Sequence, residues 1–254
     1  MIDLTGKIAL VTGSSRGIGS ACAIRMAEAG ADVIVNYVSS RTAAEEVAHK
    51  IAALGRETAV IKADIGEPDD VVEMMDFVRE NFGKIDILVS NAATGGFRPL
   101  VTTMPKHFEA AMRINVQGLI SLVQAALPLL ERSDERSKVI ALSSHGSHRA
   151  LPAYGLIGST KAALESMVRH FALELGGRGI NFNTVQAGLV ETDSFLQMPN
   201  REKILEAKRA RSLTGNRYLT AEDVADTVAF LASPMSDLVQ GATIVVDAGA
   251  NVFA

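Results

Sequence analysis

The sequence lacks several features that mark particular classes of protein. It contains one cysteine, Cys22, so it can form neither an intrachain disulfide nor a thiolate metal cluster. We expect no metal site, and we expect Cys22 to pack inside the protein because its neighbours follow an apolar helical pattern. The formal net charge is −4 and no cluster of Lys or Arg stands out, which argues against nucleic acid as a partner.

Long hydrophobic runs are also missing. No run reaches the ~18 apolar residues that a membrane span needs, and residues 1–7 lack the charged and apolar regions of a secretory leader. We therefore expect no membrane partner and a cytoplasmic location. With 48% hydrophobic and 21% charged residues of both signs, the chain has the composition of a globular protein.

Short aliphatic runs alternate with segments of helical periodicity along the whole chain. The runs predict seven strands, at 8–11, 33–37, 59–62, 85–89, 139–142, 181–185 and 243–246. The periodic segments predict amphipathic helices at 18–29, 42–54, 69–82, 162–175 and 221–231. Strands joined by helices in this way form an α/β fold of the Rossmann type, a doubly wound parallel sheet with helices on both faces. Ligands bind such sheets at the carboxyl ends of the strands.

No linker or internal repeat divides the chain, so residues 1–254 are predicted to form a single domain. One stretch, 189–218, is less regular and carries Pro199 and Gly215. Because it follows the sixth predicted strand at the ligand edge of the sheet, we expect it to form a substrate lid.

A glycine-rich turn connects the first strand to the first helix. Backbone N–H groups of such a turn, together with the positive end of the helix dipole, bind a pyrophosphate. The pattern therefore predicts a dinucleotide-binding site, and the turn residues assigned to it are Gly13, Ser15, Arg16, Gly17, Ile18 and Gly19.

The end of the second strand bears on the choice of nucleotide. NAD-binding folds place an Asp or Glu there, whose carboxylate takes the ribose 2′-hydroxyl, whereas this chain has Asn36. A carboxylate would repel a 2′-phosphate. Its absence, with Arg16 in the turn and Ser39, Ser40 and Arg41 after the strand, favours NADP(H); Arg41 could equally be a solvated cation at a helix start.

Other residues at the strand ends complete the expected nucleotide site. Asp64 and Ile65 follow the third strand and could hold the adenine edge, although Asp64 could simply belong to a turn. His145 and His148 flank the expected site, but without a visible partner we interpret them as loop histidines rather than as metal ligands or bases.

Motifs at several separate points resemble the short-chain dehydrogenase/reductase family over essentially the whole chain. They are the glycine turn, Asn91-Ala92-Ala93 after the fourth strand, Asn115, Ser144, Lys161 and Asp247-Ala248-Gly249. The family places a catalytic tyrosine four residues before the lysine, whereas this chain has Ile157 there.

The nearest tyrosine is Tyr154, with six intervening residues before Lys161. This spacing resembles the enoyl-acyl-carrier-protein reductases. Asn91-Ala92-Ala93, Ser143-Ser144-His145-Gly146-Ser147, Glu191-Thr192-Asp193 and Pro199-Asn200-Arg201-Glu202 look most like the NADPH-dependent type first known from bacilli.

The displaced tyrosine fits a different reaction. In enoyl reduction hydride goes to the β-carbon and negative charge develops on the thioester oxygen, two carbons away, so the stabilising O–H must stand farther out. Three residues along a helix correspond to a shift of about 4.5 Å. Seven residues are close to two turns, so Tyr154 and Lys161 share a face if the helix includes both.

The resemblance implies a role for each residue. Tyr154 hydrogen-bonds the developing enolate oxygen, and Lys161 holds the nicotinamide ribose. Ser144 either helps to hold the substrate oxygen or only lines the site, and Asn115 supports a water path near the lysine or only a helix kink. The remaining residues assigned to the nucleotide site are Asn91, Ala92, Gly188 and Thr192, where Thr192 could instead be an ordinary helix cap.

Three hypotheses follow. The first is an NADPH-dependent enoyl thioester reductase of fatty-acid or polyketide-type biosynthesis, acting on an acyl group carried by acyl carrier protein or coenzyme A. The second is a carbonyl reductase of the same family in which the proton-donating residue occupies a different position in the sequence. The third is a non-catalytic NADP-binding protein, against which the joint presence of Asn115, Tyr154 and Lys161 speaks. The resemblance also implies a homotetramer.

Overall fold

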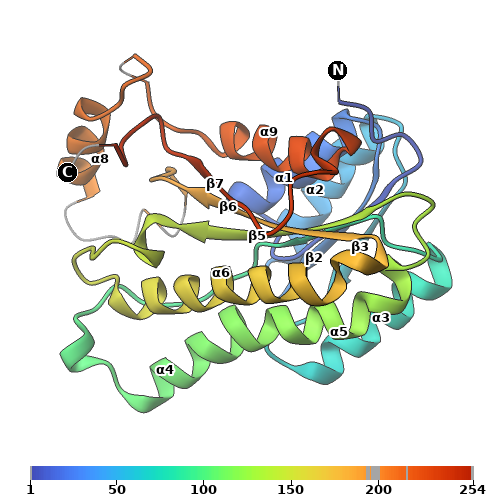
Figure 1. Cartoon of the computed structure of the whole chain (residues 1–254), viewed down its shortest axis with the longest axis horizontal. Coiled ribbons are helices and arrows are strands. Elements are labelled where there is room, and N and C mark those ends of the chain that lie inside the picture. The colour runs from blue at the N-terminus through green and yellow to red at the C-terminus, as the bar shows by residue number, and fades with distance from the viewer. Residues whose placement is uncertain (1, 193–194, 196–200, 216, 253–254) are drawn as a thin grey trace.

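The computed structural model has one seven-stranded sheet whose strands are all parallel, in the order β3-β2-β1-β4-β5-β6-β7 (Figure 1). It describes residues 2–192, 195, 201–215 and 217–252, without the side chains of 207–209. The strands are β1 (Ile8–Val11), β2 (Asp32–Tyr37), β3 (Thr58–Lys62), β4 (Ile87–Ser90), β5 (Ser137–Ser144), β6 (Ile180–Ala187) and β7 (Thr243–Val246). This topology confirms the predicted Rossmann-type fold.

Helices cover both faces of the sheet (Figure 1). One face packs against α1 (Gly17–Glu28), α2 (Arg41–Ala53) and α9 (Ala221–Ala232), and the other against α3 (Pro68–Asn81), α5 (Gly118–Leu130) and α6 (Gly155–Leu175). Along β1, Ala9 and Val11 join the first hydrophobic cluster while Ile8 and Leu10 join the second. Alternate side chains of a strand point to opposite faces, so a strand covered on both faces must be apolar throughout.

Three of the described helices were not predicted from the sequence. They are α5 itself, α4 (Pro105–Met112), which leads through a π-helical turn (Arg113–Gln117) into α5, and α8 (Arg201–Ala210) within the expected lid. The helical stretch Pro105–Leu130 is also long and apolar enough, by length and composition, to be a candidate membrane span. Half of its most apolar window is buried inside the domain, as in the core helix of a Rossmann fold.

Cys22 is fully buried in α1, and burial raises the pKa of its thiol to about 12. The expectation that it packs in the core is confirmed. Of the motif residues quoted from the sequence, Asp193, Pro199 and Asn200 lie outside the described part of the chain.

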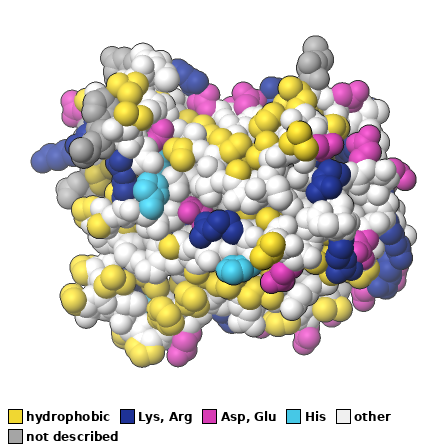
Figure 2. All heavy atoms as spheres, in the orientation of Figure 1, with side chains coloured by type: hydrophobic (Ala, Val, Ile, Leu, Met, Phe, Trp, Pro, Cys, Tyr) yellow, Lys and Arg dark blue, Asp and Glu magenta, His cyan; other side chains and the backbone are white. Residues whose placement is uncertain are grey.

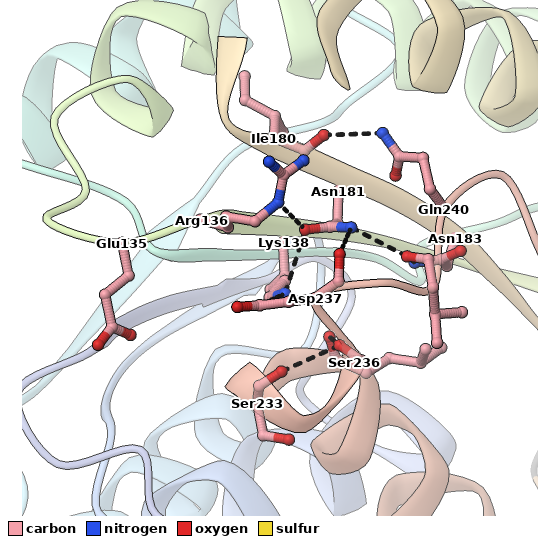
Figure 3. Close-up of polar contacts among 12 residues, drawn as sticks. Glu135, Arg136, Lys138, Ile180, Asn181, Asn183, Ser233, Ser236, Asp237 and Gln240 are labelled. Carbon is pink, nitrogen blue, oxygen red and sulfur yellow. Dashed lines mark hydrogen bonds and ion pairs between the residues drawn. The ribbon is translucent and has the colours of Figure 1, made fainter. Parts of the chain in front are cut away.

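A polar cluster fixes the connection to β7 at the amino ends of the strands, opposite the ligand edge (Figure 3). The Asn181 side-chain oxygen accepts hydrogen bonds from Arg136 Nε (2.7 Å) and Lys138 Nζ (3.1 Å), and its amide donates to the Asp237 carbonyl (3.1 Å). Lys138 Nζ also lies 2.5 Å from Asp237 Oδ1. Since the buried Asn181 and Lys138 hold Asp237, the cluster anchors the loop that leads into β7.

Candidate active site

A cleft of about 450 Å³ lies at the carboxyl ends of β1, β2 and β4. Eleven of the residues assigned to the nucleotide from the sequence line it: Gly13, Ser15, Arg16, Gly17, Ile18, Gly19, Asp64, Ile65, Asn91, Ala92 and Thr192. The remaining lining residues are Tyr37, Val38, Ser39, Ser40, Ala93, Thr94 and Ile114. The size and polar lining fit a dinucleotide, with Arg16, Ser39 and Ser40 near the end of β2.

The glycine turn needs its glycines for two reasons. Gly13 and Gly17 have φ of +61° and +58°, a backbone conformation that costs side-chain-bearing residues energy. A Cβ on Gly13 would also stand 2.9 Å from the Ala92 Cα, and one on Gly19 would stand 2.4 Å from the Asn91 side-chain nitrogen. The turn therefore packs directly against the chain that follows β4, with no room for side chains at Gly13 and Gly19.

Four residues that were assigned to the nucleotide, Asn36, Arg41, Lys161 and Gly188, do not line this cleft. Asn36 is fully buried, where its Oδ1 accepts from Gly13 N (3.0 Å) and its Nδ2 donates to the Ala63 carbonyl (3.0 Å). It braces the turn instead of facing the cleft. Arg41 is largely exposed, pairs with Glu45 at 2.8 Å and is not among the lining residues. The sequence could not show either side-chain direction.

Tyr154 and Ser144 form the centre of the candidate catalytic group. Their hydroxyl oxygens lie 2.9 Å apart. Burial raises the pKa of the Tyr154 phenol, an effect that the Ser144 hydrogen bond partly offsets, so the tyrosine is a neutral O–H donor at pH 7. The ring of Phe97, a residue not singled out from the sequence, lies with its centroid 5.9 Å from that of Tyr154.

The backbone at Tyr154 differs from the expected helix. Tyr154 is the N-cap of α6, outside the helix that carries Lys161, and the residue before it, Ala153, has φ of +58°. Residues other than glycine seldom adopt this conformation. The turn, and not helical periodicity, therefore sets the direction of the tyrosine side chain.

Lys161 is buried at the carboxyl end of β5. Its Nζ donates a hydrogen bond of 2.6 Å to the Leu142 carbonyl. Burial lowers the pKa of Lys161 to about 8, while the charge of Glu165, one turn further along α6, acts in the opposite direction. The amine therefore keeps most of its positive charge at pH 7 and can favour negative charge that develops nearby.

Asn115 lies in the π-helical turn and holds the loop after β4. It accepts from Thr94 N (2.7 Å) and donates to the Thr94 carbonyl (2.8 Å) and to Thr160 Oγ1 (2.9 Å). Thr160 precedes Lys161, so Asn115 connects the loop to the helix that bears the lysine. Both polar atoms of the Asn115 side chain, Oδ1 and Nδ2, therefore have hydrogen-bond partners within the protein.

Ile157 occupies the place where the family has its tyrosine, and it is buried. A Cβ on Gly95 would stand 2.4 Å from the Ile157 Cγ1, so the backbone of the loop after β4 closes directly over the isoleucine. An aliphatic side chain covered in this way offers no O–H to a substrate. The hydroxyls of Ser159 and Thr160 on α6 donate to carbonyls of their own helix, so Tyr154 is the hydroxyl that this helix and its N-terminal turn can offer.

The sequence did not reveal that His145, which we interpreted as a loop histidine, has a carboxylate neighbour. It is buried in a 3₁₀ turn, η3 (His145–Ser147), and its Nε2 lies 3.1 Å from Asp247 Oδ2, at ion-pair distance although the contact is bent. Gly188, which was assigned to the nucleotide, packs against Asp247: a Cβ added to Gly188 would stand 2.9 Å from the Asp247 Cβ. Among the described residues, no group of three or more His, Cys, Asp or Glu could hold a metal ion.

Comparisons with known proteins agree with this architecture. A family model described as enoyl-(acyl carrier protein) reductase matches residues 13–251. The chain is 34% identical to 1-cyclohexenylcarbonyl-CoA reductase of Streptomyces collinus, over 98% of this chain and 88% of that protein. It is 36% identical to a versicolorin reductase of Emericella nidulans, over 97% and 96% of the two chains.

Solved structures are equally similar. A short-chain dehydrogenase from Burkholderia cenocepacia in complex with NADP superposes with a TM-score of 0.89 at 36% identity, over 98% of this chain and 99% of that one. The reductase LugOII, described as catalysing keto-reduction at C1 in lugdunomycin biosynthesis, gives 0.88 at 34% identity, over 97% and 98%. The chain belongs to the short-chain dehydrogenase/reductase family, and its relatives are reductases.

Proposed function

We propose that the protein catalyses NADPH-dependent reduction of the trans-2 double bond of an enoyl thioester. The observation that carries this proposal is the pairing of Tyr154 with Ser144 beside a covered Ile157. The acid is displaced from the family position, and a displaced donor suits a reaction in which charge develops two carbons away from the carbon that receives hydride.

The cleft residues would hold the nucleotide. The backbone of the glycine turn faces the pyrophosphate, and Arg16, Ser39 and Ser40 supply donors for a 2′-phosphate. Thr192 lines the end of the cleft toward the lid. When bound, NADPH supplies the hydride. No carboxylate lies at the end of β2 to repel the additional phosphate, since Asn36 is turned inward.

The chain's own residues then act on the thioester oxygen. The Tyr154 hydroxyl donates to this oxygen as negative charge develops on it, and the raised pKa of the phenol keeps the proton in place until that stage. Ser144, 2.9 Å away, orients the tyrosine hydroxyl. Lys161, charged and held by the Leu142 carbonyl, stabilises the electron-rich transition state. Solvent supplies the proton for the α-carbon.

An apolar surface lies next to this group. Figure 2 shows hydrophobic side chains gathered over α4 and the segment before it, where Leu100, Val101, Met104 and Phe108 are all exposed. Leu100 also packs against Gly155, the residue after Tyr154. Such a surface suits an acyl chain. The relative from Streptomyces collinus takes, by its name, an α,β-unsaturated CoA thioester, which supports the same substrate class.

Ketone reduction is the second candidate. It is favoured by the direct Ser144–Tyr154 hydrogen bond, because a hydroxyl pair of this kind can also polarise a ketone oxygen, and by the keto-reduction attributed to LugOII. The two candidates predict different substrates for the same hydroxyl group.

The test is to follow NADPH absorbance with a trans-2-enoyl thioester and the matching 3-keto thioester in parallel. We expect consumption with the enoyl substrate alone. Tyr154→Phe should reduce kcat at least 100-fold, the usual effect of losing a donor to a developing oxyanion, with little change in NADPH affinity. Consumption with the keto substrate alone would reject enoyl reduction in favour of the second candidate. Turnover of neither, with NADPH still bound, would favour a non-catalytic NADP-binding protein.

Nucleotide preference has its own test. Arg16→Ala should weaken NADPH binding about tenfold or more relative to NADH, because it removes a cation that lines the cleft. Arg41→Ala is the matched control: Arg41 pairs with Glu45 outside the lining, so both nucleotides should bind as before. A larger loss from Arg41→Ala than from Arg16→Ala would contradict the assignment.

We further propose that the acyl group arrives on acyl carrier protein or coenzyme A, that the protein works in the cytoplasm, and that it assembles as a homotetramer like its family. Sedimentation that finds only monomer would refute the last proposal. Turnover of the enoyl group on each carrier separately tests the first.

A further inference from the structure

The segment that follows β7, residues 247–251, is bound to the turn that follows β5. The Asp247 Oδ2 lies 3.1 Å from the His145 Nε2, a close contact rather than an aligned hydrogen bond, and both side chains are almost completely buried. Further along, the Asn251 Nδ2 lies 3.0 Å from the His148 ring, and the Asn251 carbonyl accepts from Arg149. The two pieces of chain are thus joined at both ends of the turn.

The same turn determines the position of the tyrosine. It begins directly after Ser144, the hydrogen-bond partner of Tyr154. A Cβ on Gly146 would stand 2.3 Å from the Tyr154 Cδ1, and a Cβ on Gly158 would stand 2.4 Å from the Gly146 carbonyl oxygen. The turn is therefore packed between the tyrosine ring and α6 with no room for a side chain at either glycine, and groups packed this closely do not shift separately.

The Asp247 carboxylate is itself fixed by a strained backbone. Its Oδ1 accepts from Gly249 N (2.9 Å), which leaves Oδ2 for His145. Between them Ala248 has φ of +57°, a conformation that a residue with a side chain keeps only where its surroundings impose it. Ala153, on the other side of the turn, has the same feature.

The segment also touches the expected lid. The Leu213 amide donates to the Ala248 carbonyl (2.8 Å), and a Cβ on Gly249 would stand 2.9 Å from the Leu213 Cδ1. Residues 247–251 therefore stand between the lid and the turn that holds the tyrosine.

We propose that residues 247–251 position the Ser144–Tyr154 pair, and that Asp247, acting through His145, is the positioning residue. Asp247 touches neither reacting atom nor nucleotide cleft; it holds the turn against the tyrosine ring. The inference rests on the proposed function only in taking Tyr154 as the hydroxyl donor, and it holds for the enoyl and the keto substrate alike.

The test compares Asp247→Ala with Asp247→Asn on whichever of the two substrates the wild type reduces. We expect Asp247→Ala to lower kcat at least tenfold while the KM for NADPH changes less than twofold, because the residues of the cleft are unaltered. Asp247→Asn should recover kcat to within about threefold of wild type, since an amide still accepts from the Gly249 amide and still fills the space beside His145.

A matched control is Ser236→Ala. Ser236 is also fully buried and donates to the Leu231 (2.8 Å) and Ser233 (3.0 Å) carbonyls, but it lies in the cluster at the opposite edge of the sheet (Figure 3). The Ser236→Ala variant should have a lower free energy of unfolding and an unchanged kcat. Should Asp247→Ala fail to fold, His145→Leu removes the same contact from the other side and is expected to give the same loss of kcat.

Hydrogen exchange gives a readout that needs no substrate. Amides of 144–158 should exchange faster in Asp247→Ala than in the wild type, with those of 13–19 unchanged. The proposal is overturned if kcat is retained, if Asp247→Asn is no better than Asp247→Ala, or if exchange increases equally in both regions. An inactive wild type with the expected exchange pattern would refute the proposed function and leave this inference standing.

Discussion

Replacing Lys161 by methionine should make the protein more stable and less active. Burial lowers the pKa of the amine from its usual 10.5 to about 8, and one pKa unit corresponds to about 1.4 kcal/mol, so burying the charged group costs about 3 kcal/mol at pH 7. Methionine has a similar shape without this cost. It loses the hydrogen bond to the Leu142 carbonyl, worth about 1 kcal/mol, which leaves a net gain of about 2 kcal/mol.

The pH dependence distinguishes this explanation from a general packing effect. Between pH 8 and 10.5 the unfolded chain holds the Lys161 proton more tightly than the folded protein does, so wild-type stability rises with pH in that window. The advantage of Lys161→Met should therefore fall from about 2 kcal/mol at pH 7 to about zero at pH 10.

Urea unfolding without nucleotide, at equal protein concentration and at both pH values, measures this difference. Lys50→Met, on the exposed last turn of α2, is the control and should show no such trend. If Lys161→Met is destabilised at both pH values, or if its advantage does not change with pH, the buried amine does not carry the charge that the mechanism requires.

Two further substitutions test the geometry of the site. Asn36→Asp should lower the free energy of unfolding by about 1–3 kcal/mol, because a carboxylate oxygen would face the Ala63 carbonyl. It should also weaken the binding of NADPH and of NADH to the same extent. Tighter NADH binding at unchanged stability would contradict this. Gly146→Ala should lower kcat about 100-fold, because the new methyl group displaces Tyr154. Its NADPH affinity, measured by fluorescence titration, should be preserved. Gly177→Ala is the control: there is open space around Gly177, so kcat should be unchanged.

The strands and the nucleotide turn were largely predictable because their signals are local. A four-residue apolar run such as Ile8–Val11 needs no distant information to indicate a strand buried on both faces. Helix α5 (Gly118–Leu130) was missed because it is apolar along most of its length and contains Pro128, so its buried residues do not form a separate stripe against a polar face.

Side-chain direction was the harder part of the site. Asn36 was assigned from its place in the chain, but the partners that turn it inward, Gly13 and Ala63, lie on other elements. His145 seemed to have no partner because Asp247 is remote in sequence, and the neighbouring His148–Asn251 pair spans 103 positions. Long-range pairing of this kind leaves no periodic trace in a single sequence.

The order in which the ribosome makes this chain has a consequence for when it becomes competent. Most of the nucleotide cleft is built from residues before 115, but the helices beside it share a hydrophobic cluster with α9, and a domain of this kind folds as a unit. The turn beside Tyr154 acquires its Asp247 and Asn251 contacts only after β7 has emerged and paired with β6. The last strand to be synthesised therefore completes the catalytic turn.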